Sequence, residues 1–239
     1  MNQQFRDKVV LVAGGTGGLG TSVSLAFLRE GAKVFVSYKR KEEFSSLQRS
    51  AETIEGSLTG LEVDVTDETS VKRMIERIVQ EHGRLDCLVN TVGGYAGGTK
   101  LWELDNVVWD RLFALNLRSN YLLSRAVVPE MLKRKSGAIL NVIAKAAFDH
   151  AAGAAAYAAS KAAALAMMDS LAEDLRSTGV RANSILPSII DTEANRKEMP
   201  SADFDKWPKP DDIARVILFL CSEDAKVVHG AAVPVYGDR

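Results

Sequence analysis

The stretch VAGGTGGLG, residues 12–20, carries five glycines among the seven residues 14–20. It joins an apolar run of strand length, residues 8–13, to a segment with helical spacing of apolar residues, 18–31. Glycine lets a pyrophosphate approach the backbone, and the amino end of a helix presents free N–H groups to an anion. A strand, a glycine loop and a helix in this order therefore predict a dinucleotide-binding unit.

Two glycine spacings can be found in this loop. Gly15, Gly17 and Gly20 fit G-x-G-x-x-G, whereas Gly14, Gly18 and Gly20 fit G-x-x-x-G-x-G. A tight structural turn is the alternative interpretation of the loop. Five glycines are more than such a turn needs, so we prefer the phosphate-binding interpretation.

Apolar runs and amphipathic segments alternate along the rest of the chain. Strands are expected at 8–13, 33–37, 57–64, 85–90, 138–143, 180–186 and 231–236, and helices at 18–31, 67–83, 157–178 and 211–222. Asp67 is expected to cap the second of these helices and Gly83 to end it. The pattern predicts one α/β domain over residues 1–239. We expect a Rossmann-type, doubly wound, mostly parallel seven-stranded sheet with helices on both faces.

The composition is that of an ordinary globular protein. Of 239 residues, 46% are hydrophobic and 26% charged, and the formal net charge is −1, so no nucleic-acid or membrane partner is expected. The amino terminus has no signal-like apolar region, which favours a cytoplasmic location. Cys87 and Cys221 lack C-x-x-C spacing, and the three histidines are scattered, so buried thiols are expected rather than a disulfide or a metal site.

The residues after the second expected strand bear on the choice of dinucleotide. An acidic residue there binds the ribose hydroxyls of NAD, whereas a basic residue suits the 2′-phosphate of NADP. Residues 33–37 lead into Tyr38, Lys39 and Arg40, and no carboxylate occurs before Glu42. This predicts that NADPH is preferred over NADH, with a solvated charged turn as the alternative.

The stretch AKAAFDHAAGAAAYAASK, residues 144–161, ends in Tyr157 and Lys161, which lie one helical turn apart. A phenol with a pKa near 10 is a poor acid–base group at neutral pH, but a nearby ammonium favours the phenolate and lowers the phenol pKa. Tyr157 could then give its proton to an atom made basic by hydride arrival, while Lys161 donates to ribose hydroxyls. Chance spacing of the two residues is the alternative.

Taken together, these features resemble the short-chain dehydrogenase/reductase family over nearly the whole chain. The glycine loop matches in its second spacing, G-x-x-x-G-x-G, and Tyr157 and Lys161 match Y-x-x-x-K. DVTD (64–67) resembles the adenine-binding segment, and NTVGG (90–94) resembles the N-A-G turn. LPSIIDT (186–192) is similar to the nicotinamide-contacting segment, with Ser188 in place of glycine.

The resemblance implies a role for each matching residue. The catalytic residues would be Asn116, Tyr157 and Lys161. The cofactor would be held by Tyr157 and Lys161 together with Gly14, Thr16, Gly17, Gly18, Leu19, Gly20, Tyr38, Lys39, Arg40, Asp64, Val65, Asn90, Val92, Gly93, Pro187, Ile190 and Thr192.

One residue departs from the family pattern. The family's catalytic serine precedes the tyrosine by 13 residues, which is position 144, and this position holds Ala144. No Ser or Thr lies between Ser136 and Ser160. Because the serine polarises a substrate carbonyl, its loss typically costs about 10²–10³ in rate. The protein is then either a poor oxidoreductase or one whose substrate is already electrophilic.

A narrower resemblance, to dihydropteridine reductases, favours the electrophilic substrate. It rests on GGYAGG (93–98), AKAAFD (144–149) and DTEANRKEMPSADFDKW (191–207), the last within an expected substrate loop at about 188–210. It implies quinonoid dihydropterin, an oxidised imine system that needs a proton donor more than a polarising hydroxyl. The chain departs from that group at Tyr38-Lys39, where those enzymes have Asp, and in having Asn116.

Two other functions stay open. One is a carbonyl or hydroxyl dehydrogenase in which a water replaces the serine hydroxyl, and the other is an NAD(P)-binding regulatory protein that has lost catalysis. Family members commonly pair through the helix that bears the tyrosine, and its small-residue face, residues 155–168, would allow close approach. The resemblance therefore implies a homodimer or homotetramer acting on a small molecule.

Overall fold

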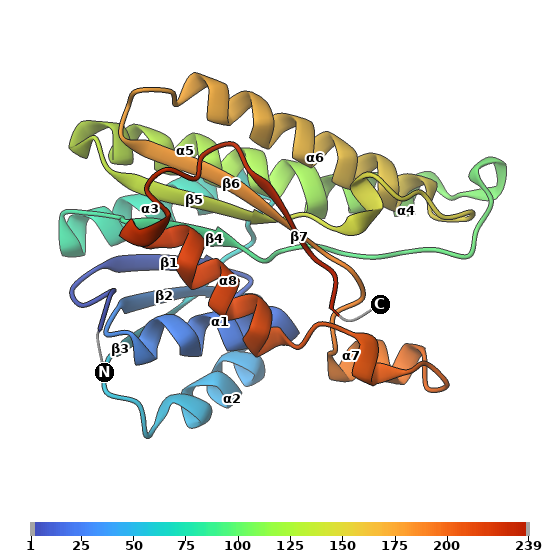
Figure 1. Cartoon of the computed structure of the whole chain (residues 1–239), viewed down its shortest axis with the longest axis horizontal. Helices are drawn as coiled ribbons and strands as arrows, with labels where there is room; N and C mark the ends of the chain where they lie inside the picture. The colour runs from blue at the N-terminus through green and yellow to red at the C-terminus, as the bar shows by residue number, and fades with distance from the viewer. Residues whose placement is uncertain (1–2, 238–239) are drawn as a thin grey trace.

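The computed structural model describes residues 3–237 and centres on one parallel seven-stranded sheet (Figure 1). The strand order is β3-β2-β1-β4-β5-β6-β7. The strands are Val9–Ala13 (β1), Lys33–Tyr38 (β2), Ser57–Glu62 (β3), Cys87–Asn90 (β4), Gly137–Val142 (β5), Val180–Pro187 (β6) and Ala232–Val235 (β7). The chain starts in the middle of the sheet, runs out to β3 and returns to β4, which confirms the predicted doubly wound topology.

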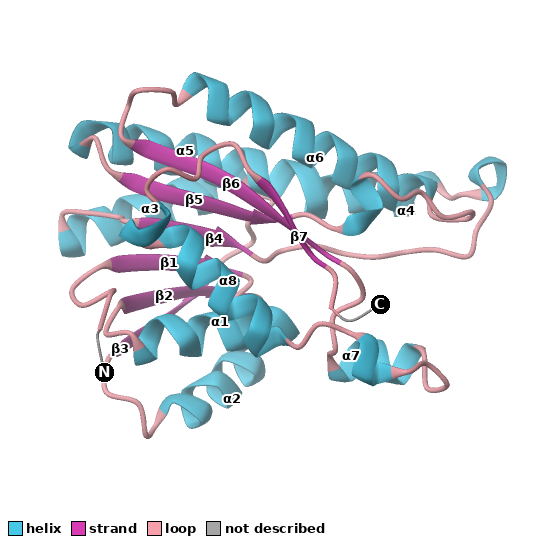
Figure 2. Cartoon of the chain, viewed as in Figure 1, coloured by secondary structure: helices cyan, strands magenta, loops and turns pink. Residues whose placement is uncertain are grey.

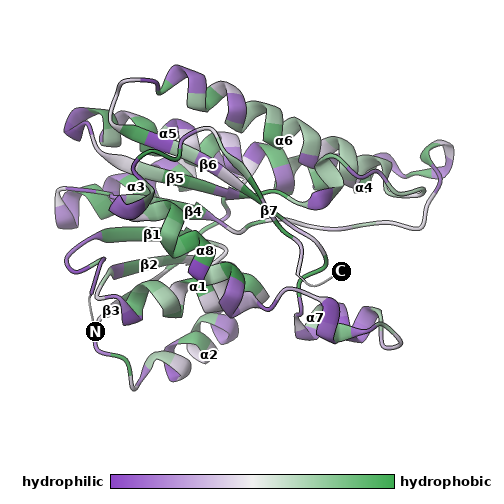
Figure 3. Cartoon of the chain, viewed as in Figure 1, coloured by the Kyte–Doolittle hydropathy of each residue, from purple (hydrophilic) through white to green (hydrophobic). Residues whose placement is uncertain are grey.

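Helices cover both faces of the sheet, as Figure 2 shows. On one face lie α1 (Gly18–Arg29), α2 (Lys41–Ala51) and α8 (Pro210–Cys221), and on the other lie α3 (Glu68–His82), α5 (Ser119–Arg134) and α6 (Ala155–Asp174). Alternate strand residues fill the two cores: Val10 and Val12 face the α1–α8 side, and Val9 and Leu11 face the α5–α6 side. The central strands are correspondingly rich in apolar residues (Figure 3).

The predicted strands and helices are all present, and Asp67 and Gly83 bound α3 as expected. The Asp67 side chain accepts a hydrogen bond from the Ser70 N–H at 2.7 Å, and Gly83 has φ 68°. No strand end shifts by more than two residues.

Several helices escaped the sequence prediction. They are α2, the pair α4 (Asn106–Phe113) and α5 joined by a π-helical turn over Ala114–Arg118, and α7 (Glu193–Glu198). In α2 only Phe44, Leu47 and Ala51 are buried, so its apolar stripe is short. In α5 an internal Pro129 and buried polar residues break the pattern.

Cys87 and Cys221 are both buried and free, as expected. Between residues 3 and 237, no group of three or more potential metal-ligating side chains comes together. In the same part of the chain, no helix combines the length and apolarity needed to cross a membrane.

Candidate active site

The glycine loop lies between β1 and α1, and of its five glycines only Gly17 has room for a Cβ, so both glycine spacings contain residues that must be small. A Cβ on Gly20 would lie 2.1 Å from the carbonyl oxygen of Gly14, and Gly14 itself has φ +72°. A Cβ on Gly18 would lie 2.7 Å from Cγ2 of Thr192. Substituting any of these three glycines therefore strains the loop. The bare backbone beside the amino end of α1 fits a pyrophosphate.

The other predicted cofactor residues gather at the carboxyl edge of the same sheet. Val92 packs against the loop, because a Cβ on Gly14 would lie 2.9 Å from its Cγ2. Asn90 ends β4, and its Oδ1 accepts a hydrogen bond from the Val92 N–H at 3.0 Å. The buried Nδ2 of Asn90 finds no hydrogen-bond partner among the described residues, so it is a donor available at this edge. Leu19 and Val65 are buried in the two cores and contribute packing.

The residues after β2 are engaged in contacts within the chain. Tyr38 stacks on Phe44 with ring centroids 5.0 Å apart. Lys39 Nζ lies 3.0 Å from Asp64 Oδ2, and Arg40 pairs with Glu43. The sequence analysis assigned Lys39 and Arg40 to the 2′-phosphate of NADP, and the structure shows that each of them also has a carboxylate partner within the chain.

Asp64 is strongly held as a carboxylate. Its partial burial acts to raise the pKa of this carboxyl, but hydrogen bonds from the Thr66 side chain and N–H and the contact with Lys39 lower the pKa to about 2. Asp64 is therefore ionised at neutral pH and lies beside Lys39.

Tyr157 and Lys161 lie on α6 beneath the same edge. Lys161 is buried, and its Nζ donates to the carbonyl oxygen of Val142 at 3.0 Å. A Cβ on Gly93 would lie 3.2 Å from this Nζ, so a larger residue in the 90–94 turn would crowd the amine. The structure thus brings β4, β5 and α6 together around Lys161.

Asn116 lies in the π-helical turn before α5 and holds the 90–94 turn in place. Its Oδ1 accepts from the Gly94 N–H at 2.9 Å, and its Nδ2 donates to the Gly94 carbonyl at 3.0 Å. Nδ2 also donates to Ser160 Oγ at 2.9 Å, and Ser160 Oγ donates to the Tyr157 carbonyl at 2.9 Å. Asn116 therefore ties the 90–94 turn to the helix that carries Tyr157.

The pKa values of Tyr157 and Lys161 are both shifted, and the Tyr157 shift is opposite to the one expected from the sequence. Burial, with a smaller effect of Tyr95, raises the pKa of Tyr157 to about 12. Burial lowers the pKa of Lys161 to about 8. The expected lowering of the tyrosine pKa by an ammonium is wrong for this structure, because both groups are desolvated and desolvation favours their neutral forms. Tyr157 is protonated at neutral pH, as a proton donor must be.

Tyr95 is a residue that sequence reasoning did not assign to the site. Its ring lies edge-on to that of Tyr157, with centroids 5.0 Å apart and planes at 82°, and the residue is 58% exposed. The turn before α6 supports this loop, since a Cβ on Gly153 would lie 3.2 Å from Gly98 Cα. The only sequence signal was the GGYAGG stretch itself.

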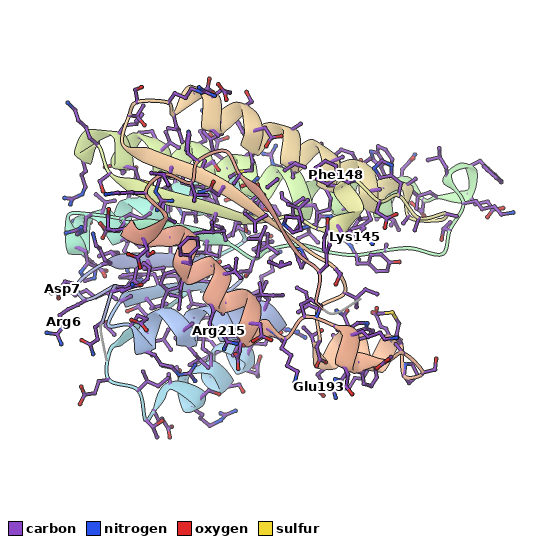
Figure 4. The ribbon with its side chains drawn as sticks, in the orientation of Figure 1. Arg6, Asp7, Lys145, Phe148, Glu193 and Arg215 are labelled. Atoms are coloured by element: carbon purple, nitrogen blue, oxygen red, sulfur yellow. The ribbon has the colours of Figure 1, made fainter. Side chains whose placement is uncertain are left out.

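Ala144 is buried, and the hydroxyls of Ser160 and Ser188 are both engaged with other partners. Ser160 Oγ is occupied between Asn116 and the Tyr157 carbonyl, and Ser188 Oγ donates to the Tyr236 carbonyl at 2.7 Å. The next side chain, Lys145, labelled in Figure 4, lies 2.9 Å from Asp149 Oδ2. The position expected to polarise a carbonyl is therefore apolar.

The expected substrate loop at 188–210 is folded. Thr192 caps α7, its Oγ1 accepting from the Asn195 N–H at 3.2 Å, and its N–H donates to the Ile190 carbonyl at 2.8 Å. Arg196 binds both carboxylate oxygens of Asp191 and lies over the ring of Phe204. Strand β6 ends at Pro187. The segment that follows it contacts the glycine loop, where Thr192 lies against Gly18.

Comparisons with known proteins agree with this geometry. The family model "short chain dehydrogenase" matches residues 8–203. The 3-oxoacyl-[acyl-carrier-protein] reductase of Thermotoga maritima is 32% identical over 242 residues, which cover 98% of each chain. A solved short-chain type dehydrogenase/reductase from Mycobacterium ulcerans has a TM-score of 0.93 and 26% identity, covering 98% of this chain and 90% of that chain. ElxO with NADP bound has a TM-score of 0.91 and 27% identity, covering 97% and 98%.

Proposed function

Because the chain belongs to the short-chain dehydrogenase/reductase family, and is thus an NAD(P)H-dependent oxidoreductase, we propose that it uses NADPH to reduce a small, electrophilic ring substrate. Quinonoid dihydropterin is the substrate that we propose. The observation that carries this proposal is the buried methyl group of Ala144 at the position of the polarising hydroxyl, beside an intact Asn116, Tyr157 and Lys161.

The residues at the carboxyl edge fit a dinucleotide. The loop at Gly14, Gly18 and Gly20 would hold its pyrophosphate, and Asp64, Asn90 and Thr192 with their neighbours would hold the adenosine and nicotinamide ends. When bound, the dinucleotide supplies the hydride. Lys39 and Arg40, with no acidic residue at the end of β2, support NADPH, and the similar protein ElxO has been solved with NADP.

Tyr157 is the proton donor in this proposal. Burial keeps its phenol protonated at neutral pH, and the substrate takes up one proton for every hydride that it accepts. Lys161 lies one helical turn from Tyr157, and burial of its amine lowers the pKa to about 8, close to neutrality. Asn116 positions Gly94 and α6 and so keeps the donor in place.

An imine substrate explains why alanine is tolerated at position 144. Reduction of a quinonoid dihydropterin adds hydride to the ring system and a proton to nitrogen, giving a tetrahydropterin. The developing charge is on nitrogen and is neutralised by Tyr157, so an oxyanion-stabilising hydroxyl is dispensable. The exposed ring of Tyr95 beside Tyr157 offers an aromatic surface to a planar substrate.

Two alternatives compete with this proposal. The similarity to a 3-oxoacyl reductase favours a carbonyl substrate, with a water in place of the serine hydroxyl. A regulatory NAD(P)-binding protein would bind NADPH without turnover, but the intact Tyr157 and Lys161 argue against it. A cytoplasmic location and a homodimeric or homotetrameric assembly are further parts of the proposal.

An NADPH-oxidation assay separates these functions. Purified protein is given NADPH with quinonoid dihydropterin, with a 3-oxoacyl thioester, or with simple aldehydes and ketones. We expect turnover of the quinonoid substrate to exceed that of any unactivated carbonyl by at least about 10²-fold, the usual worth of the missing hydroxyl. Efficient turnover of the simple ketones would instead support the carbonyl dehydrogenase, and binding without any turnover would support the regulatory protein.

A further inference from the structure

Glu43, in the first turn of α2, connects the glycine loop with the residues after β2. Its Oε2 accepts a hydrogen bond from Thr16 Oγ1 at 3.1 Å, and its Oε1 pairs with Arg40 Nη2. The side chain is only 33% exposed. Both carboxylate oxygens are thus occupied, one by a hydroxyl of the loop and one by a guanidinium.

Arg40 is one of the two cations that support NADPH in the proposed function, and Thr16 belongs to the glycine loop that would hold the pyrophosphate. A hydroxyl and a guanidinium that meet at one point are suited to a phosphate, which accepts several charge-assisted hydrogen bonds. In this structure the carboxylate of Glu43 binds both of them. A phosphate dianion and a carboxylate within a few ångströms of each other repel, so both cannot share Arg40 and Thr16 at full strength.

We propose that Glu43 is a specificity-determining residue that competes with the 2′-phosphate of NADPH for Arg40 and Thr16. This inference rests on the proposed use of a dinucleotide at this site. The carboxylate lowers the affinity for NADPH below the value that Lys39 and Arg40 alone would give, and it leaves the affinity for NADH, which has no 2′-phosphate, almost unchanged. The preference for NADPH is therefore moderate and is set by residue 43.

The test compares Glu43→Gln with Glu42→Gln. Both variants remove one negative charge from the same turn of α2, but Glu42 is exposed and makes no ion pair with any described residue. Isothermal titration calorimetry at low salt measures the dissociation constants of four probes: NADPH, NADH, adenosine 2′,5′-bisphosphate and 5′-AMP. The last two report on the phosphate subsite without hydride chemistry.

We expect Glu43→Gln to tighten NADPH and the bisphosphate about tenfold and to change NADH and 5′-AMP by less than about threefold. Glu42→Gln should change all four by less than about threefold, and the tightening should shrink as salt screens the repulsion. Circular dichroism melts of both variants check that the fold is kept, since the amide oxygen of a glutamine at position 43 can still accept from Thr16.

Three results would overturn the role of Glu43. They are an unchanged NADPH affinity in Glu43→Gln, an equal gain in Glu42→Gln, or a loss of NADH affinity, which would make Glu43 an acceptor for the ribose hydroxyls. The proposed NADPH preference fails separately, if the parent protein binds NADH as tightly as NADPH. Binding of neither nucleotide by the parent would overturn both.

Discussion

Lys161 Nζ donates a 3.0 Å hydrogen bond to the carbonyl oxygen of Val142, and the residue is buried. Burial lowers the pKa of this amine to about 8. The unfolded chain, in which a lysine has its ordinary pKa of about 10.4, binds more protons than the folded chain between these two values. The free energy of unfolding should therefore rise as the pH rises through this window.

We predict a gain of up to about 3 kcal/mol between pH 7.5 and pH 10, from the size of this pKa difference. Urea denaturation of the nucleotide-free protein at a series of pH values measures it. Lys161→Met removes the buried amine and should be more stable than the parent at pH 7.5, with the difference shrinking towards pH 10. An equal pH slope in the two proteins would show that Lys161 is not the titrating group.

Tyr157→Phe tests the proton donor. The change keeps the ring and its edge-on contact with Tyr95 but removes the hydroxyl, so turnover should fall by the ~10²–10⁴ typical of a lost general acid. The dissociation constant for NADPH should change by only a few-fold. Tyr95→Phe, which removes the neighbouring hydroxyl instead, serves as the matched control and should keep turnover within about tenfold. Equal losses in both variants would leave Tyr157 without a distinct role.

Local sequence signals predicted the scaffold of the site well. Strand-length apolar runs and the cap at Asp67 depend on near neighbours, and the glycine loop and the Tyr157–Lys161 spacing lie within single segments. Parallel strands then bring these segments to one edge of the sheet, which makes their meeting predictable from the topology alone.

Contacts between distant segments were not predictable in this way. Glu43 lies in a helix whose apolar stripe is short, and its contact with Thr16 joins residues 27 positions apart. The place of Tyr95 depends on how the 93–98 loop packs against Gly153, which no periodic pattern encodes. The direction of the Tyr157 pKa shift follows from burial, and a sequence does not report the burial of a single hydroxyl.

Lys39→Ala tests the choice of nucleotide. Lys39 lies 3.0 Å from Asp64, so its removal both deletes a cation and leaves the Asp64 carboxylate uncompensated beside the proposed phosphate position. We expect NADPH binding to weaken by about tenfold or more while NADH binding changes by a few-fold, which erases most of the preference. Lys41→Ala, at an exposed cation on α2, is the control and should have little effect. Parallel titrations with both nucleotides give the result.

The proposed dimer or tetramer can be tested at the surface where α4, the π-helical turn and α5 meet α6. A hollow of about 510 Å³ there is lined by Asp110, Arg118 and apolar side chains that include Phe113, Leu117 and the 45%-exposed Tyr121. We expect light scattering at micromolar concentration to report a dimer or tetramer. Tyr121→Glu should reduce the measured mass of the assembly, because it places a charge in the proposed subunit interface. Val227→Glu, an exposed site beyond α8, should leave it unchanged, and a monomeric parent would contradict the proposed pairing.

The variant Ala144→Ser tests which class of substrate the enzyme reduces. The buried methyl lies at the position of the family's carbonyl-polarising hydroxyl, and Ser160 and Ser188 are committed to other partners. If the natural substrate is an imine such as quinonoid dihydropterin, its barrier does not depend on an oxyanion donor. Restoring the hydroxyl should then change its turnover by only a few-fold. An ordinary ketone does depend on polarisation, so its reduction should rise by up to ~10²-fold in the same variant.

The comparison uses steady-state rates of the parent, Ala144→Ser and Ala144→Gly on both substrates. Ala144→Gly controls for a change of size at this position without adding a donor, so it should not raise ketone reduction. A parent already fast on ketones, with no gain from the serine, would mean that another donor polarises the carbonyl. In that case the alanine would reveal nothing about the substrate. A gain on the ketone alone would tie the missing hydroxyl to an electrophilic substrate, because only the substrate that needs polarising responds to its return.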